Sequence, residues 1–350
     1  MLDNNFMNDS GGADRKPPVD TNDVNGSDKN RPSARIAFAL FAASVALLFC
    51  ARQFITVGDD WLPLWQLTQE IVFFGLPWAI YYQAKPDAKP FTRMTRIPLG
   101  RGGTPIQTGE RGAARPIRIS TCLVTALAAL IGLEYFSGMD TLWVALLSRF
   151  GLNLDTLGQW LAAENSEGLF TSLLAMAAAP ALFEELSFRG LLLPAMERYG
   201  SGRAAVITGL LFALAHMSLP GLPTHLLLGV ALGMLAIASD SLILPMIYHF
   251  AHNAGAIMAG YFTQVDATLA LRELLSRDVT LTVFIQTAVS FALWALMIRS
   301  VFMSASFGLP KTAQGSPKRE RFPRGLAIAI TLLTLALLSV YALQFAALKT

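Results

Sequence analysis

Two adjacent carboxylates and an arginine stand inside an otherwise apolar run of this 350-residue chain. They are Glu184, Glu185 and Arg189, and the run from Leu169 to Met196 is long enough to cross a bilayer. A charge at membrane depth costs roughly 3 kcal/mol on insertion scales, so it faces a protein interior or a wet cavity. On a helix Glu185 and Arg189 are i,i+4 neighbours that can pair, whereas Glu184 points about 100° away. The pattern predicts one held carboxylate and one that is free to do chemistry.

Two histidine faces follow in later apolar runs. Phe212 stands four residues before His216, and His249 stands four residues before Asn253, so each pair shares one side of a helix. A single histidine on an apolar face is more often a satisfied core residue. Two such faces close in sequence to a buried carboxylate pair favour a functional site over a purely structural ion-pair lock.

The order Glu-Glu-x-x-x-Arg, Phe-x-x-x-His, His-x-x-x-Asn resembles the CAAX protease and bacteriocin-processing family of intramembrane endopeptidases, also called CPBP or Abi. The resemblance covers roughly residues 165–262. It implies hydrolysis of a peptide bond inside the membrane by a water that a glutamate activates, within a helical bundle whose cavity opens to one side. The partners that it implies are a membrane-associated protein or peptide substrate and the lipid bilayer.

This resemblance assigns expected roles to the motif residues. Glu184 is the expected general base, and His216 shares the water with it. His249 and Asn253 would donate hydrogen bonds to the developing oxyanion, an interaction that usually contributes most to the rate of acyl transfer. Glu185 and Arg189 are expected to form an ion pair that supports the site, and Phe212 is expected to shape the pocket.

The residue types leave open whether a metal ion takes part in the reaction. Glu184, His216 and His249 form a zinc-site inventory, but they come from three helices and no His-Glu-x-x-His motif is present. Asn253 is a poor zinc ligand and a good oxyanion donor, which favours a metal-independent glutamate protease. No cofactor is therefore assigned, and a divalent metal such as zinc is the alternative.

Composition gives the fold class. Hydrophobic residues make up 53% of the chain and charged residues only 15%, against roughly 25% charged in soluble domains. Long, continuous apolar runs predict an all-α, polytopic membrane protein with about eight or nine transmembrane helices around a catalytic core bundle. The basic residues are spread over loops, which argues against nucleic-acid binding. Cys50 and Cys122 each fall inside a predicted span, so no disulfide framework is expected.

The chain divides into four parts. Residues 1–34 are polar and are expected to be a disordered tail. Residues 35–164 hold the first membrane helices and a basic loop, 83–118, which fits a cytoplasmic anchor. Residues 165–262 form the predicted catalytic core, and residues 263–350 the C-terminal membrane helices. The positive-inside rule then places the N-terminus in the cytoplasm. The expected location of the protein is the cell (inner) membrane.

The segment Leu142–Ala162 is a weaker apolar stretch, predicted to be interfacial or re-entrant, with a full span as the alternative. Glu70 has no histidine or arginine within one turn, and it is interpreted as a polar packing contact or as lying near the surface. His225 and His252 have no motif partner and are left out of the site. The predicted spans are Ile36–Ile55, Leu62–Tyr82, Ile119–Tyr135, Leu169–Met196, Ala204–Met217, Thr224–Ala238, Leu242–Phe262, Val279–Met303 and Leu326–Ala347.

Two other functions compete with the endopeptidase. A proton-coupled transporter could use Glu184, Glu185 and the histidines as a proton relay, although no second Glu-Glu-x-x-x-Arg segment suggests an inverted repeat. A non-catalytic membrane scaffold or immunity protein could retain the motifs without activity. The substrate stays open between a prenylated C-terminus, a bacteriocin leader, a sorting-signal peptide and a membrane-anchored regulator.

Overall fold

The computed structural model describes residues 32–55, 57–58, 61–85, 117–151, 166–263, 280–305 and 320–347. Every regular element in these ranges is a helix, which confirms the all-α class. Most of the predicted tail, most of the basic loop 83–118, and residues 152–162 of the Leu142–Ala162 segment lie outside the described residues.

The described part of the chain forms nine helical rods, most of which coincide with the predicted spans to within a few residues. Two rods contain π-helical turns, labelled η2, η4 and η5. The rods are α2 (Ala34–Phe54); α3 (Leu62–Gln69), η2 (Glu70–Gly75) and α4 (Leu76–Ala84); α5 (Ile119–Ser148); α6 (Ser166–Ser172), η4 (Leu173–Ala178), α7 (Ala179–Ser187), η5 (Phe188–Leu192), α8 (Leu193–Met196) and η6 (Glu197–Tyr199); α9 (Ser201–Ala215); α10 (Leu222–Ser239); α11 (Ile243–Thr263); α13 (Thr280–Ala305); and α14 (Arg324–Ala347).

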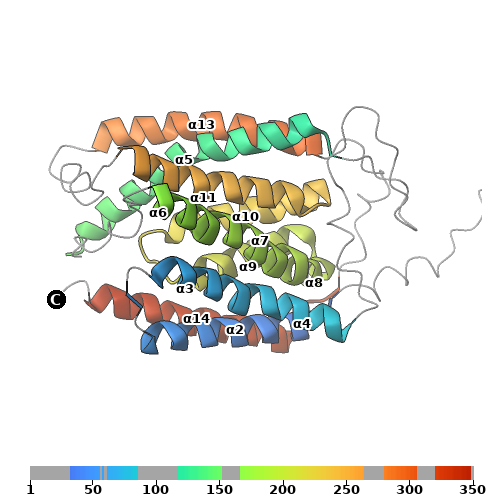
Figure 1. Cartoon of the computed structure of the whole chain (residues 1–350). Helices are drawn as coiled ribbons and strands as arrows, with labels where there is room; N and C mark the ends of the chain where they lie inside the picture. The colour runs from blue at the N-terminus through green and yellow to red at the C-terminus, as the bar shows by residue number, and fades with distance from the viewer. Residues whose placement is uncertain are drawn as a thin grey trace, which may run out of the picture.

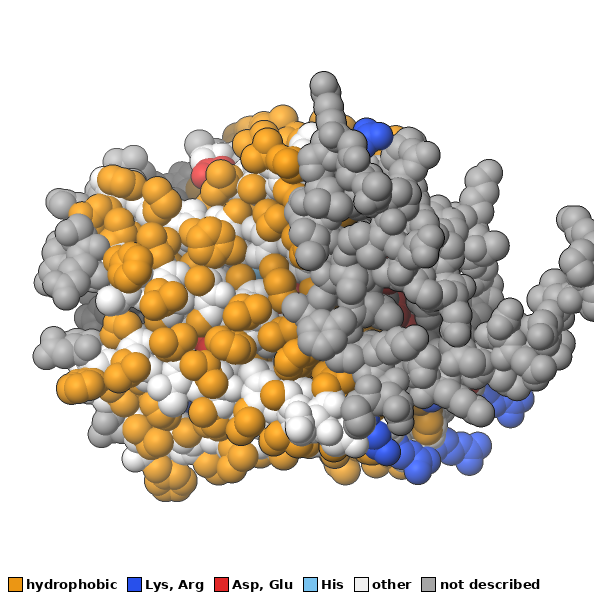
Figure 2. Space-filling view, turned by 45° about the vertical axis from the view of Figure 1, so that its right-hand side comes forward, with side chains coloured by type: hydrophobic (Ala, Val, Ile, Leu, Met, Phe, Trp, Pro, Cys, Tyr) orange, Lys and Arg blue, Asp and Glu red, His pale blue; other side chains and the backbone are white. Residues whose placement is uncertain are grey.

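Among the described residues, five helical stretches are long and apolar enough to cross a membrane. Large apolar side chains also stay exposed on the outside of the bundle, for example Leu281, Phe284 and Leu296 on α13. On the described part of the face in Figure 2, hydrophobic side chains predominate, and the Lys and Arg side chains visible there lie toward the right-hand end. These features are those of an integral membrane protein. How many of the nine rods cross the bilayer stays a prediction.

The site-bearing helices lie in the middle of the bundle (Figure 1). The pair α5 and α13 forms one edge, and α2 with α14 forms the other, with α7, α9, α10 and α11 between them. Glycines bring α9 and α10 close together: a Cβ added to Gly209 would lie 2.7 Å from the backbone nitrogen of Val230. Close backbone approach at small residues is the usual way in which membrane helices pack.

The helix α5 differs from the sequence prediction, which ended a span at Tyr135 and began a separate segment at Leu142. The structure has one continuous helix to Ser148. The residues that weaken the apolar run have partners on other helices: Gly138 packs against the Thr287 side chain, and Asp140 accepts a hydrogen bond from Thr224 Oγ1 at 2.7 Å. Because neighbouring helices satisfy these residues, the helix continues through them.

Candidate active site

A side-chain hydrogen bond connects α11 to the irregular rod that carries the Glu-Glu motif. Pro180 lacks an N–H, so the carbonyl oxygen of Met176, four residues earlier, lacks the usual i+4 donor. Asn253 Nδ2 donates to this oxygen at 3.0 Å. The π-helical turn η4 contains Met176, and such turns are frequent at functional sites. This hydrogen bond connects α11, which carries Asn253, to the rod that carries the Glu-Glu motif.

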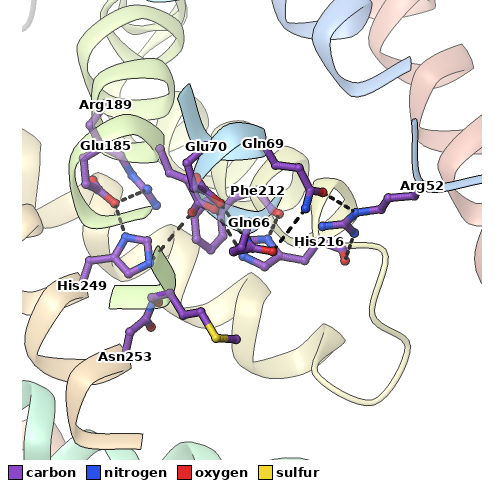
Figure 3. Close-up of polar contacts among 12 residues, drawn as sticks. Arg52, Gln66, Gln69, Glu70, Glu185, Arg189, Phe212, His216, His249 and Asn253 are labelled. Atoms are coloured by element: carbon purple, nitrogen blue, oxygen red, sulfur yellow. Dashed lines mark hydrogen bonds and ion pairs between the residues drawn. The ribbon is translucent and has the colours of Figure 1, made fainter. Parts of the chain in front are cut away.

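Glu185 and Arg189 form the predicted ion pair, and both side chains are fully buried. Arg189 Nη1 donates to Glu185 Oε1 at 2.7 Å, and Nη2 donates to the carbonyl oxygen of Gly229 on α10 at 2.8 Å. His249 Nδ1 lies 2.9 Å from the same Glu185 oxygen (Figure 3). Glu185 is therefore held by side chains from two helical rods.

The neighbouring carboxylate, Glu184, is only 4% exposed and faces two imidazole rings. His216 Nε2 lies 3.9 Å from its Oε1, and His249 Nε2 lies 3.9 Å from its Oε2. Both distances are too long for a direct hydrogen bond. The structure therefore brings Glu184, His216 and His249 together from three rods, with each carboxylate oxygen opposite one ring nitrogen.

The hydrogen bonds of the two rings define their tautomers. His216 Nδ1 lies 2.8 Å from the carbonyl oxygen of Phe212, which only accepts, so Nδ1 carries the proton. His249 Nδ1 faces the Glu185 carboxylate and is assigned as a donor in the same way. The Nε2 atom is then the nitrogen of each ring that faces Glu184.

Phe212 lies at the centre of this cluster and is fully buried. Its ring centroid is 4.7 Å from the guanidinium carbon of Arg189, a cation–π distance. The same ring lies 4.5 Å from the His216 ring and 5.9 Å from the His249 ring, between centroids. It therefore contacts Arg189 and both histidines at once.

Two residues at the site have no signal in local sequence spacing. His225, at the start of α10, stacks on His216 with ring centroids 3.9 Å apart. Glu70 is 2% exposed, which agrees with the expected polar packing contact and not with the alternative of a place near the surface. Its carboxyl accepts a hydrogen bond from Gln66, and its turn η2 packs against α7, which carries Glu184. The stacking of His225 on His216 and the packing of η2 on α7 join separate parts of the chain, so spacing along one helix cannot show them.

Glu184, His216 and His249 are also the set that the sequence offered as alternative metal ligands. In the described part of the chain, no group of three or more His, Cys, Asp or Glu side chains could hold a metal ion. The choice between an oxyanion site and a metal site therefore stays a prediction, which rests on Asn253 as a poor zinc ligand.

A comparison with protein families matches residues 166–255 to the family described as type II CAAX prenyl endopeptidase Rce1-like. This segment contains all three motifs, from Glu184 to Asn253. Comparisons with curated proteins and with solved structures gave no match. The family implies a protease, and the apolar helices are those of a membrane protein. Residues 166–255 thus match the Rce1-like type II CAAX prenyl endopeptidase family, which confirms the resemblance that the three motifs indicated.

Proposed function

We propose that this protein is an intramembrane endopeptidase that hydrolyses a peptide bond of a membrane-associated protein or peptide. One observation carries the proposal: the two oxygens of the buried Glu184 carboxylate each face the Nε2 atom of a histidine at 3.9 Å. A water between Glu184 and His216 would give each of them a hydrogen-bond donor, because it has one hydrogen for each. The match of this segment to a protease family supports the same chemistry.

In the proposed reaction Glu184 is the general base. It takes one proton from the water while His216 Nε2 accepts the other hydrogen, and the water oxygen bonds to the scissile carbonyl carbon. Glu184 then passes the proton to the amide nitrogen as the C–N bond breaks. General-base catalysis of this kind contributes roughly 10²–10⁴-fold to the rate.

The negative charge that develops on the carbonyl oxygen needs donors. Asn253 Nδ2 has two hydrogens, one of which bonds Met176, so the second can reach an oxyanion. His249, whose Nδ1 is held by Glu185 at 2.9 Å, is the proposed second donor. Donors of this type usually supply the largest single contribution to acyl transfer. In this scheme the Glu185–Arg189 pair acts by orienting the His249 ring.

The distribution of charge supports a cytoplasmic N-terminus. Arg198 Nη2 donates to the carbonyl oxygen of Pro32 and Arg198 Nη1 lies 3.9 Å from Glu320, so three chain segments meet at one end of the bundle. Most described Lys and Arg residues lie in or beside the helix ends that an alternating up-and-down course of the nine rods brings to this side, in agreement with the positive-inside rule. They are Arg35, Lys85, Arg118, Arg198, Arg203, Arg299, Arg321 and Arg324.

The test is a peptide survey with the purified full-length chain in detergent or lipid nanodiscs. Prenylated and unprenylated C-terminal peptides are incubated with wild type, with Glu184→Ala and with Glu134→Gln, a matched change of an exposed carboxyl on α5. Cleavage by wild type and Glu134→Gln, and not by Glu184→Ala, is the expected result. Cleavage that persists in Glu184→Ala would contradict the proposal, and pH-dependent flux without cleavage would support the transporter.

A further inference from the structure

A pocket of about 560 Å³ lies between the N-terminal end of α5 and the C-terminal part of α13, the helix pair at one edge of the bundle (Figure 1). Its volume is in the range of pockets that bind small molecules. The described residues that line it include two arginines, two serines and no acidic side chain; they are Arg118, Leu296, Arg299, Ser300, Met303 and Ser304. None of them belongs to the candidate active site.

The two arginines are brought together by the packing of the residues beside them. Ile117 is 3% exposed and belongs to the same apolar cluster as Ile298 and Val301 on α13. Arg118 directly follows Ile117, and Arg299 directly follows Ile298; both arginines are exposed. The buried isoleucines therefore hold the two chain segments together, and the arginines that follow them reach the surface at the same pocket.

A hydrogen bond between the two helices fixes the wall of the pocket. Thr121 Oγ1 and Ser304 Oγ are 2.6 Å apart. Thr121 is 2% exposed, and Ser304 lines the pocket. The two helix ends are therefore connected directly beneath the arginines, so the pocket is formed without a ligand.

The pocket lies at the level where a membrane protein meets lipid headgroups. Both α5 and α13 contain stretches that are long and apolar enough to cross a membrane, Ile119–Ser148 and Val283–Ser304. Arg118 directly precedes the first stretch. Arg299 lies five residues, or about 8 Å, before the end of the second, and a long arginine side chain can extend from this depth to the interface. Leu296 lies about one turn deeper on the same face and is 66% exposed. The pocket thus has a cationic rim and an apolar wall on its membrane side.

We infer that this pocket binds the headgroup of an anionic glycerophospholipid. Arg118 and Arg299 hold the phosphate, because a guanidinium group matches the geometry of phosphate oxygens and an anion between two cations removes their mutual repulsion. The Ser300 hydroxyl is a further donor, and an acyl chain lies along Leu296. Basic pockets between transmembrane helices bind anionic headgroups in this way. The inference concerns lipid binding and does not depend on peptide cleavage.

A bound lipid would connect α13 to the rest of the bundle. Among the five candidate spans of the described residues, the one on α13 is the least covered by protein: 22% of its most apolar part is buried, against 39–44% for the other four. A headgroup held by Arg118 and Arg299 joins this helix to the start of α5. Because a ligand that binds the folded state stabilises it, the lipid should raise the unfolding midpoint.

The test measures lipid binding to the delipidated full-length chain in detergent by native mass spectrometry. The probes are phosphatidylglycerol and phosphatidylcholine with the same acyl chains, and the variants are Arg118→Gln and Arg299→Gln. Wild type should bind phosphatidylglycerol more tightly than phosphatidylcholine, and each variant should lose about tenfold or more in affinity for phosphatidylglycerol, as for the loss of a hydrogen bond to a charged group.

The matched control is Arg203→Gln, which removes the same charge from an exposed arginine outside the pocket, at the start of α9. Its affinity for phosphatidylglycerol should stay close to that of wild type, because an exposed charge away from the bound lipid is screened. Equal losses in Arg203→Gln and in the pocket variants would indicate general attraction between charges and would overturn the inference. Equal affinities of wild type for the two lipids would also overturn it.

Unfolding midpoints with and without each probe separate a lipid from a free phosphate ion. Phosphatidylglycerol should raise the midpoint of wild type and of Arg203→Gln, and it should not raise that of the double variant Arg118→Gln with Arg299→Gln. The shift is compared within each variant, so a change in its starting stability does not affect the result. Inorganic phosphate at the same concentration and ionic strength should give no shift. A shift with inorganic phosphate as large as with phosphatidylglycerol would assign the pocket to a free phosphate ion and overturn the lipid site.

Discussion

Replacing Arg189 by leucine tests whether its guanidinium maintains the charge balance of the site. Arg189 is fully buried and donates to Glu185 and to the Gly229 carbonyl. In Arg189→Leu the Glu185 carboxylate stays buried with His249 Nδ1 as its remaining donor. Removing one partner of a buried ion pair costs about 3–5 kcal/mol, and the lost contact with Phe212 acts in the same direction. We expect the free energy of unfolding to fall by at least the lower of these values.

The assay is unfolding of the purified protein in mixed micelles with increasing SDS, followed by circular dichroism. The control is Arg198→Leu, because Arg198 is partly exposed and its partner Glu320 is 3.9 Å away and 42% exposed; such pairs contribute about 0–1 kcal/mol. The double variant Glu185→Gln with Arg189→Leu should be more stable than Arg189→Leu alone, since it removes the buried carboxylate that Arg189→Leu leaves without its guanidinium partner. Equal stabilities of the two single variants, or of the single and the double, would refute the reasoning.

Three further outcomes follow from the site. Asn253→Ala should lower kcat by about 10²–10³-fold with little change in KM, as for loss of an oxyanion donor; a change in KM alone would contradict this role. His216→Ala should lower kcat as much as Glu184→Gln does, and the double variant should lower it little further, because the effects of residues that act as one unit are not additive. A double variant whose fold loss in kcat equals the product of the two single losses would contradict that. Dialysis against a chelator should leave cleavage unchanged, and restoration of a lost activity by zinc would favour the metal-assisted alternative.

The positions of the helices could be predicted from the sequence because membrane helices must be long and continuously apolar. The predicted Leu326–Ala347 span and the observed α14 from Arg324 to Ala347 differ only at one end. The prediction failed at α5, where Asp140 and Gly138 dilute the apolar run. Their partners, Thr224 and Thr287, lie on other helices, and apolar content along one helix carries no information about them.

The site shows the same limit. The Glu185–Arg189 pair could be predicted because both residues lie one helical turn apart on a single rod. The stacking of His225 on His216, and the packing of η2 with Glu70 against α7 with Glu184, depend on how separate rods pack. The π-helical turns are equally invisible to a 3.6-residue pattern, although Pro180 marks the place where the Met176 carbonyl needs an outside donor.

Turnover by Glu184→Gln tests the central claim most directly. The variant keeps the shape of the side chain and its hydrogen-bonding capacity, but it cannot take a proton from water. With a cleaved peptide in hand, single-turnover rates are measured for wild type and for Glu184→Gln, with unfolding midpoints to show that the fold is retained. If Glu184 is the general base, the rate falls by at least about 10²-fold at an unchanged unfolding midpoint. A Glu184→Gln protein that cleaves the peptide at the wild-type rate would contradict this role.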